Sequence, residues 1–442
     1  MSTVLCVDFG STFTKAALVE TATGDLLARH EVPTTLGTDV LDGYAQIRAA
    51  LAAAGLEQVD EVLACSSAGG GLRLAVVGYE REVTAQAGYR VGLSAGAKVV
   101  HVSAGPLSGP DLGVLRQARP DIVLLVGGTD GGNAEVLLHN ASRLAKGRVG
   151  APIVVAGNAD AAPAVAELLA STGRRYVVTD NVLPQIGVIA PDAARAAIRA
   201  VFLRHVIGGK GLSRGPAFAE MVQAATPDAV LAGVEVLAQA VAGDVLVVDI
   251  GGATTDVYSA LEPQGEDAGL AKDVVAPLWH ARTVEADLGM RWNAEGVVEA
   301  AQREHLPVPE DLKAYAARLA ADPGHLPVDE AEEELDLALA RTAAVVAVRR
   351  HARPPSPGSS PRPLADVAHV VGSGGVLRHA TPRRQHAVLA AVANDHAGGW
   401  KVPRSAALST DSAYLLGAVG LLARQYPAAA RALAERTVGA RS

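Results

Sequence analysis

The sequence predicts an α/β protein that contains one supersecondary unit twice. Its 442 residues exceed the length of one ordinary domain, and hydrophobic residues make up 49% of them, enough for a sizeable core. Apolar runs alternate with helical patterns between Asp121 and Asp180. A strand that ends in an acidic residue, followed by a glycine-containing turn and a returning strand, occurs near the N-terminus and again about 240 residues later.

The first forty residues read as short strands joined by tight turns, and a helix follows them. Val4–Val7 is an apolar run, Gly10–Thr12 is a turn of small residues, and Lys15–Glu20 is the returning strand. Leu26–Val32 adds a third strand. Apolar residues then recur every three or four positions over Val40–Ala54, which predicts a helix.

The middle third alternates strand and helix. Asp121–Val126, Pro152–Ala156 and Tyr176–Thr179 are short, continuously apolar runs, as expected for strands buried on both faces. Helical patterns over Ala134–Leu144 and Ala161–Ser171 separate them. The segment therefore predicts a βαβαβ unit with parallel strands.

The N-terminal pattern then recurs after a predicted helix over Ala229–Ala242. Asp244–Asp249 is a strand, Gly251–Thr255 is a turn of glycine and threonine, and Val257–Ala260 is the returning strand. Because the repeat occurs twice at long spacing, it indicates an internal duplication rather than a solenoid.

The C-terminal part adds a long helix and one more strand. The helix predicted over Asp329–Arg350 begins with acids and ends with two arginines, which suits the helix dipole. Residues 353–363 contain five prolines and predict an exposed, mobile loop. Asp366–Val371 predicts a strand, and Gly372–Gly375 turns from it into a helix.

Composition excludes several classes of protein. The 39 basic and 47 acidic side chains give a net charge of −8, which argues against a nucleic-acid partner. No apolar run approaches the ~20 residues of a spanning helix, and the first residues lack the features of a signal peptide, so we expect no membrane association. The two cysteines, Cys6 and Cys65, have no Cys-x-x-Cys spacing, which favours a reducing cytoplasm and excludes a cysteine-based zinc site; Cys6 reads as a core thiol.

Three glycine-containing turns carry the strongest chemical signal: Asp8–Lys15, Asp249–Asp256 and Gly372–Gly375. In the first two, a strand delivers a carboxylate to its end and a turn poor in side chains follows. Glycines let backbone N–H groups point into one concavity, and the Ser and Thr hydroxyls add donors for phosphate oxygens. Two facing carboxylates suit Mg²⁺, which keeps much of its hydration shell. The third turn brings backbone close to a flat ligand such as a base and ribose.

In this order and spacing, the turns resemble the phosphate-1, phosphate-2 and adenosine motifs of the actin/Hsp70/sugar-kinase superfamily. The resemblance implies a two-lobed actin-like ATPase fold, a duplicated ribonuclease H-like α/β fold with Mg·ATP between the lobes. The implied lobes are residues 1–243, with an inserted βαβ region at about 65–215, and residues 244–442. Ala253 departs from the pattern, since many members carry a third glycine there; we expect a slightly narrower loop with its N–H donors kept.

Four further segments are similar to the MutL/GlmL family, the accessory proteins of adenosylcobalamin-dependent glutamate mutase. They are Cys65–Leu72, Leu125–Asn133, Val155–Asn158 and Arg282–Gly289, and the likeness runs from Val4 to about Leu422. The family shares only a name with the mismatch-repair MutL, which has a different ATPase fold and binds DNA.

This resemblance implies an ATP-hydrolysing chaperone that reactivates a B12-dependent mutase by letting damaged cobalamin exchange. ATP and Mg²⁺ are the implied cofactors, and mutase subunits are the implied partners. The identity of the mutase and the oligomeric state stay open. The first two turns are also compatible with a small-molecule kinase or an ATP-dependent ring-opening enzyme of the same superfamily, and a non-hydrolysing structural member is a third alternative.

The expected site combines two carboxylates with a set of small residues. Asp8 and Asp249 are expected to hold Mg²⁺ through its waters and to position the attacking water. Lys15 either offsets phosphate charge or points to solvent. The residues expected to bind the nucleotide are Gly10, Ser11, Thr12, Lys15, Gly251, Gly252, Thr254, Thr255, Gly372, Gly374 and Gly375.

Three other features have competing interpretations. The loop Gly127–Asn133 is either a second anion site or, as we favour, a tight turn capped by Asn133 or Asp130. Glu285 and Asp287 either face the cleft as a pair or are solvated charges. The stretch 394–399 only loosely resembles an Asp-x-His-x-x-Gly cobalamin motif and follows a helical pattern, so we expect no cofactor ligation by His396.

Overall fold

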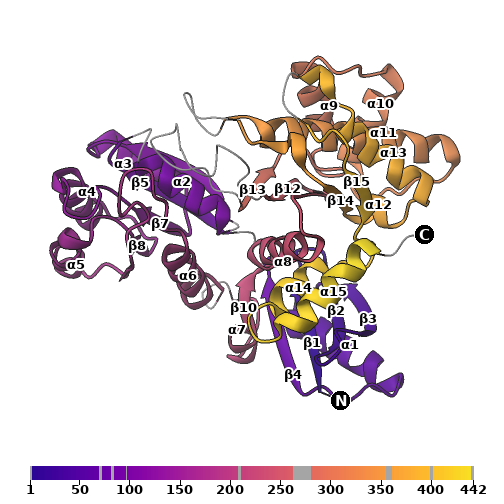
Figure 1. Cartoon of the computed structure of the whole chain (residues 1–442), viewed down its shortest axis with the longest axis horizontal. Helices are drawn as coiled ribbons and strands as arrows, with labels where there is room; N and C mark the ends of the chain where they lie inside the picture. The colour runs from indigo at the N-terminus through magenta and orange to yellow at the C-terminus, as the bar shows by residue number, and fades with distance from the viewer. Residues whose placement is uncertain are drawn as a thin grey trace. The chain divides into compact units, whose positions relative to one another are not determined.

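The computed structural model describes residues 2–68, 72–80, 84–95, 97–207, 211–261, 280–354, 361–398 and 402–439. Its described residues fall into two compact units, one comprising 2–232, 280–281 and 420–429 and the other comprising 233–261, 282–419 and 430–439. They contain three five-stranded sheets (Figure 1). Among the described helices, none combines the length and the apolar character that a bilayer crossing requires.

The first sheet is built around the N-terminal hairpin and has the order β10-β4-β1-β2-β3. The neighbouring pairs β1–β2 and β2–β3 are antiparallel, whereas β4 runs parallel to β1 and β10 runs parallel to β4. The side chains of Leu5, Val7 and Phe9 point into one core with Ile47 of α1 (Val40–Ala53). The strands are β1 (Thr3–Phe9), β2 (Phe13–Glu20), β3 (Leu26–Pro33), β4 (Glu61–Ser66) and β10 (Val222–Ala225).

The second sheet repeats this plan around the second hairpin, with the order β13-β12-β11-β14-β15. Here β11 and β12 are antiparallel, β14 runs parallel to β11, and β15 runs parallel to β14. The strands are β11 (Val245–Ile250), β12 (Thr255–Ala260), β13 (His280–Glu285), β14 (His369–Ser373) and β15 (Ala407–Thr410). Because a hairpin with a third strand on one side and two parallel strands on the other occurs in both units, the expected duplicated α/β fold is confirmed.

The third sheet is inserted in the chain between β4 and β10, and all of its neighbouring strands are parallel. Its order, β6-β5-β7-β8-β9, is the flavodoxin-like order of a doubly wound sheet. The strands are β5 (Arg73–Gly78), β6 (Lys98–Ala104), β7 (Ile122–Leu125), β8 (Ile153–Val155) and β9 (Tyr176–Val178). The last three confirm the βαβαβ unit, and the insertion confirms the expected inserted region.

Helices cover both faces of this inserted sheet, which explains its uninterrupted apolar runs. Along β7, Val123 and Leu125 join the core formed with α3, α4 and α5, whereas Ile122 and Leu124 join the core formed with α2 and α6. Figure 1 shows α4 and α5 on one side of β7 and β8, and α6 on the other. The helices are α2 (Thr84–Ser94), α3 (Gly109–Gln117), α4 (Glu135–Lys146), α5 (Ala162–Ala170) and α6 (Asp192–Val201), followed by the π-helical η2 (Phe202–Ile207).

Asp329 begins the longest described helix, α11 (Glu330–Ala352), because its side chain accepts a hydrogen bond from the Glu332 N–H. The helix packs on α9, α13 and β12. The other helices are α7 (Ala217–Met221), α8 (Thr226–Val241), α9 (Ala294–Arg303), α10 (Glu310–Ala321), α12 (Gly375–Arg378), α13 (Pro382–Ala393), α14 (Leu416–Leu422) and α15 (Pro427–Gly439), with short 3₁₀ turns η1 (Ala159–Ala161), η4 (Leu364–Asp366) and η5 (His396–Gly398).

The structure differs from the prediction at one strand boundary, and some of the predicted segments lie partly outside the described residues. Asp366 belongs to η4, so β14 begins at His369 and runs on to Ser373. Of the proline-rich segment, residues 355–360 lie outside the described residues, as do residues 69–71 of the Cys65–Leu72 segment and residue 399. Cys6 and Cys65 are both buried free thiols, as expected for Cys6.

Candidate functional site

The first turn follows the C-terminal end of β1, where Asp8 lies opposite Lys15 of β2. The turn closes through a hydrogen bond from the Gly10 N–H to the Phe13 carbonyl, at 3.1 Å. A Cβ at Gly10 would lie 2.6 Å from that carbonyl oxygen, so only glycine fits there. Thr34 holds the turn from the side: its hydroxyl donates to the Gly10 carbonyl at 2.8 Å and its N–H donates to the Thr12 carbonyl at 2.8 Å. Ser11 and Thr12 are both exposed.

Asp8 is oriented by two groups that the sequence pattern does not reveal. The Thr226 hydroxyl at the start of α8 donates to Asp8 Oδ1 at 2.5 Å, and the Cys65 thiol of β4 lies 3.6 Å from the same oxygen. Burial, with a further contribution from Asp8, raises the pKa of the Cys65 thiol, which therefore stays protonated and able to donate. Thr226-Pro227-Asp228 is recognisable in sequence as a helix start, but not as a neighbour of Asp8.

The second turn has the same closing bond, from the Gly251 N–H to the Thr254 carbonyl at 2.9 Å. A Cβ at Gly251 would lie 2.9 Å from that oxygen, which again requires glycine. Gly252 and Ala253 are exposed and Thr254 is half-buried. Ala253 is not among the residues with positive φ, so its methyl group brings no backbone strain. Thr255 is fully buried and its hydroxyl donates to the Leu288 carbonyl at 2.6 Å; its expected phosphate contact stays a prediction.

The segment after β13 donates hydrogen bonds to the carbonyl oxygens of the second turn. The Gly251 carbonyl accepts from the Met290 N–H at 3.0 Å, the Gly252 carbonyl accepts from the Arg291 N–H at 2.8 Å, and the Ala253 carbonyl accepts from the Asn293 side chain at 2.9 Å. Arg291 is itself fixed by two hydrogen bonds to Asp336, at 2.8 and 3.1 Å. The turn is therefore rigid on its carbonyl side, as Thr34 makes the first turn rigid.

Asp249 occupies the position in β11 that Asp8 occupies in β1, and it lies opposite Asp256 where Asp8 lies opposite Lys15. Asp256 forms an ion pair with the buried Arg282 at 3.1 Å, and its Oδ1 is buried without a hydrogen-bond partner. Burial raises the pKa of Tyr258; Arg282 opposes the change, and the carboxylates of Asp256 and Asp249 add to it. Asp256 and Arg282 are thus part of the surroundings of Asp249. Both belong to segments that the sequence patterns marked, Asp249–Asp256 and Arg282–Gly289, but neither residue was assigned a role.

The third turn joins β14 to α12 and lies against the end of β11. Gly374 has φ +105°, and a Cβ there would lie 2.2 Å from the Ile250 carbonyl oxygen, so the position requires glycine. A Cβ at Gly372 would lie 2.5 Å from the Leu377 side chain. By contrast, a Cβ at Gly375 meets nothing within 4 Å. Gly372 and Gly374 therefore let the chain pass close to its neighbours, and Gly375 begins α12 beside open space.

These features fit the expected nucleotide. Each hairpin has a carboxylate two residues before a tight turn in which glycine is required, and exposed hydroxyls or backbone follow it. Within the part of the chain that the structure describes, no three His, Cys, Asp or Glu side chains gather closely enough to hold a metal ion. The contact of Asp8 and Asp249 with Mg²⁺ through water stays a prediction, as do the phosphate contacts and the expected domain boundaries.

Comparison with known proteins identifies the family. The family model described as MutL protein matches residues 4–438. The chain belongs to the MutL protein family. Protein MutL of Clostridium tetanomorphum is 35% identical to it over 454 residues, covering 97% of each chain.

Solved structures also resemble this MutL family member. An acetone carboxylase solved without nucleotide is 14% identical, with a TM-score of 0.41, covering 96% of this chain and 70% of that chain. A ROK hexokinase from Thermus thermophilus is 14% identical, with a TM-score of 0.29, covering 95% of this chain and 97% of that chain. Because both scores lie below 0.5, the fold is assigned from the strand order of the chain itself.

In this MutL family member, the loop Gly127–Asn133 is tied to itself and to its neighbours. The Asn158 side chain donates to the Gly132 carbonyl at 2.9 Å, and the Asn181 side chain donates to the Gly128 carbonyl at 3.0 Å. The Asn133 side chain accepts from the Glu135 N–H at 2.7 Å at the start of α4, whose N-cap residue, Ala134, has no side-chain cap. These bonds favour the interpretation as a tight turn.

Glu285 and Asp287 both bind Arg350 of α11, and their facing the cleft as a pair stays a prediction. The guanidinium donates to Glu285 Oε2 at 2.9 Å and to both Asp287 oxygens, at 2.6 and 2.9 Å. These hydrogen bonds lower the pKa of Asp287, whereas burial raises the pKa of Glu285 despite the same partner.

Asp395, in the stretch compared with a cobalamin motif, binds Arg349 through two hydrogen bonds at 2.6 Å, and His396 is exposed.

Proposed function

We propose that this protein is an ATP-dependent reactivating chaperone of an adenosylcobalamin-dependent mutase of the glutamate mutase type. Radical mutases stop working when the adenosyl group is lost and damaged cobalamin stays bound. In this proposal, a cycle of ATP binding and hydrolysis loosens the mutase and lets the corrinoid exchange.

One observation carries the ATPase half of the proposal. Asp8 and Asp249 lie at equivalent positions of two hairpins, each followed by a turn with the same closing hydrogen bond and a glycine that no larger residue can replace. Each hairpin therefore offers a ligand one carboxylate and one side-chain-poor turn. Mg·ATP, whose phosphates need donors and whose metal needs carboxylates, has that chemistry.

Each residue then has a definite role. Ser11, Thr12 and Thr254 donate hydrogen bonds to phosphate oxygens, and the carboxylates of Asp8 and Asp249 hold the waters around Mg²⁺ and orient the water that attacks the terminal phosphate. When bound, Mg²⁺ supplies charge neutralisation at the phosphates. In the proposed cycle the terminal phosphate is the switch, because its hydrogen bonds to the hydroxyls form when ATP binds and are lost on hydrolysis.

The choice of client follows from the family. Membership of the MutL protein family supports a partner among B12-dependent mutases, because the resemblance drawn from the sequence is to the accessory proteins of glutamate mutase. The net charge of −8 supports a protein partner rather than a nucleic acid. A cytoplasmic location agrees with the two free, buried thiols.

The proposal is tested by measuring ATP hydrolysis with and without a B12-dependent mutase that has been inactivated by turnover. We expect mutase activity to return only when ATP, Mg²⁺ and this protein are all present. A parallel screen offers sugars, small acids and lactams as acceptors. Phosphate transfer to one of them, or ATP-dependent ring opening, with no recovery of mutase activity, would replace the chaperone with the enzyme alternative.

A further inference from the structure

The second unit holds three charged side chains on one face of its sheet, which we call the charged row: Asp249 of β11, Asp256 of β12 and Arg282 of β13. Asp249 lies directly opposite Asp256 in the antiparallel pair, so both side chains are on the same face. The Arg282 guanidinium donates to Asp256 Oδ2 at 3.1 Å. Because β12 lies between β11 and β13, Asp256 is the middle member of the row.

The charged row is on the face of the sheet opposite to α11. On the α11 side, His351 forms hydrogen bonds with Ser259 and with Thr283, each at 2.9 Å. Asp256 lies three positions from Ser259 along β12, and Arg282 lies one position from Thr283 along β13. Since successive side chains of a strand point to opposite faces, the row does not take part in the packing of α11.

The two carboxylates of the row are unfavourable neighbours, because like charges directly opposite each other on paired strands repel. In the first unit, the residue opposite Asp8 is Lys15, which makes an attractive pair. In the second unit, Asp256 takes that place and the cation stands one strand further away, on β13. The compensating charge of the second sheet therefore comes from outside the hairpin.

Arg282 is part of the protein interior and not a surface cation. It is 6% exposed, and its guanidinium lies over the Tyr258 ring, 5.6 Å from the ring centroid. Burial lowers the pKa of Arg282, but the Asp256 carboxylate first, and then Tyr258, outweigh burial and leave the pKa above its usual value, so the side chain stays charged. A buried charge acts strongly on its neighbours because little water screens it.

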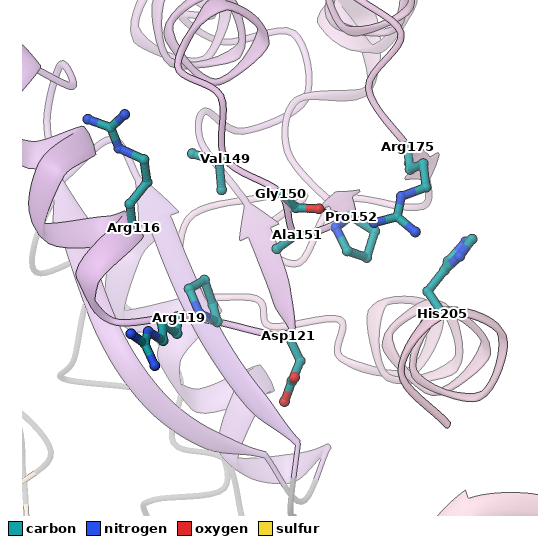
Figure 2. A pocket seen from close by; sticks show the side chains of 10 residues that line it. Arg116, Arg119, Asp121, Val149, Gly150, Ala151, Pro152, Arg175 and His205 are labelled. Carbon is teal, nitrogen blue, oxygen red and sulfur yellow. Dashed lines mark hydrogen bonds between the residues drawn. The ribbon is translucent and has the colours of Figure 1, made fainter. Parts of the chain in front are cut away.

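The exposed arginines of the inserted sheet are arranged differently. A pocket of about 400 Å³ lies at the amino ends of its strands, and Arg116, Arg119 and Arg175 line it. Figure 2 shows Arg175 on one side of Val149 and Ala151 and the other two arginines on the opposite side, so the guanidinium groups point away from one another. Water screens such charges, whereas strand pairing brings the members of the charged row together.

Arg282 determines where the Asp256 carboxylate lies. Among the described residues, Asp256 Oδ1 is buried without a hydrogen-bond partner, so the bond from Arg282 to Oδ2 is what holds this carboxylate. Arg282 is on the side of Asp256 away from Asp249, and its attraction draws the carboxylate in that direction. Without the guanidinium, the Asp256 carboxylate is free to turn toward Asp249, where it repels that carboxylate or competes with it for one cation.

We propose that Arg282 is a positioning residue for Asp249 and acts through Asp256. By drawing Asp256 aside and compensating its charge, Arg282 keeps the Asp249 carboxylate from being displaced by its neighbour. The proposal rests on the function proposed above in one respect, because it takes Asp249 as a group that orients the attacking water. The coupling of Arg282 to Asp249 across β12 is a property of the sheet itself and requires no nucleotide.

The first experiment measures this coupling by urea denaturation without nucleotide, in Asp249→Asn, Arg282→Gln and the double variant. Arg282→Gln should lower the free energy of unfolding, since it leaves the buried Asp256 unpaired. Adding Asp249→Asn removes the resulting repulsion, so it should stabilise Arg282→Gln more than it stabilises the parent, by about three- to tenfold in the unfolding equilibrium constant. If Arg282→Gln does not fold, adding Asp256→Asn should restore folding, because the unpaired carboxylate is then replaced by a neutral amide.

The second experiment measures ATP hydrolysis by the folded variants. Arg282→Gln should lower kcat by about tenfold or more and leave the KM for ATP within a few-fold of the parent value, because a small misplacement of Asp249 affects the reaction more than binding. Arg282→Lys keeps the charge and should recover most of the lost kcat. Arg349→Gln is the matched control: Arg349 is also buried and pairs with Asp395, so its loss should destabilise the fold but change neither kcat nor the effect of Asp249→Asn on stability.

The inference would be overturned by an equal effect of Asp249→Asn on the stability of the parent and of Arg282→Gln, or by an Arg282→Gln protein that Asp256→Asn does not restore to folding. Parent-like kcat in folded Arg282→Gln, or no recovery of kcat in Arg282→Lys, would make the ion pair purely structural and overturn the positioning role as well. A parent that hydrolyses no ATP would instead refute the proposed function, and a measured coupling would still support the placement of Asp249 by Arg282.

Discussion

Replacing Thr226 with valine tests whether Asp8 must be held in one orientation. Valine has nearly the shape of threonine but lacks the hydroxyl that donates to Asp8 Oδ1 at 2.5 Å. The Cys65 thiol, 3.6 Å from the same oxygen, is the weaker of the two partners and would remain. The change therefore removes the stronger constraint on the carboxylate and leaves the packing of α8 in place.

The magnitude follows from the surroundings of Asp8. A hydrogen bond to an ionised group contributes about 1.5–3 kcal/mol. Asp8 is half-buried, so water replaces part of the lost bond, and the free energy of unfolding should fall by about 1–2 kcal/mol. If Asp8 orients the attacking water, small misplacement should lower kcat for ATP hydrolysis by about 10–100-fold. The KM for ATP should change little, because many backbone N–H groups contribute to nucleotide binding.

Steady-state ATP hydrolysis and urea denaturation measure both quantities. Thr226→Ser is the matched control, since it keeps the hydroxyl, and it should restore kcat to near the parent value. If Thr226 were purely structural, Thr226→Val would lower the amount of active protein, and Thr226→Ser would not selectively restore kcat. Measuring kcat and KM separately distinguishes that case from a loss of positioning. Normal kcat in a folded Thr226→Val variant would refute the positioning role of Thr226.

Three further predictions concern the second unit. Asp249→Asn keeps the shape of the side chain but removes its charge, so ATP turnover should fall by about 10²–10⁴-fold while calorimetry shows ATP affinity within a few-fold of the parent; normal turnover would remove Asp249 from the mechanism. Gly375→Leu should fold, because nothing lies within 4 Å of a Cβ there, and its side chain should weaken ATP binding. Gly374→Leu should fail to fold, since its Cβ would lie 2.2 Å from a carbonyl oxygen. Unchanged ATP affinity in folded Gly375→Leu would exclude the adenosine role of this turn. Burial lowers the pKa of His351 well below 6.5, so the unfolded chain binds the proton more readily than the folded protein. The free energy of unfolding should therefore fall as the pH drops below 6.5, by at most ~1.4 kcal/mol per pH unit. Urea denaturation at pH 7.5 and 5.5 should show this loss in the parent and less of it in His351→Gln.

Local sequence signals predict the two hairpins and the βαβαβ unit. Both depend on short-range signals: apolar runs of strand length, turns rich in glycine, and helical periodicity between them. The positions of Asp8 and Asp249 before their turns are local in the same sense, which is why their equivalence is visible without coordinates. Local patterns do not predict β4, β5, β6, β10, β13 or β15, since those strands lack a clear alternation or apolar run with a neighbouring turn.

The residues that surround these features come from distant parts of the chain, and the tertiary fold brings them there. Thr226 lies 218 positions from Asp8, and its hydroxyl reaches the carboxylate because β10 pairs with β4 and delivers the start of α8 to that place. Arg350 reaches Glu285 and Asp287 because α11 packs against the second sheet. Strand pairing and helix packing set these distances, and neither is encoded in the local pattern of any one segment.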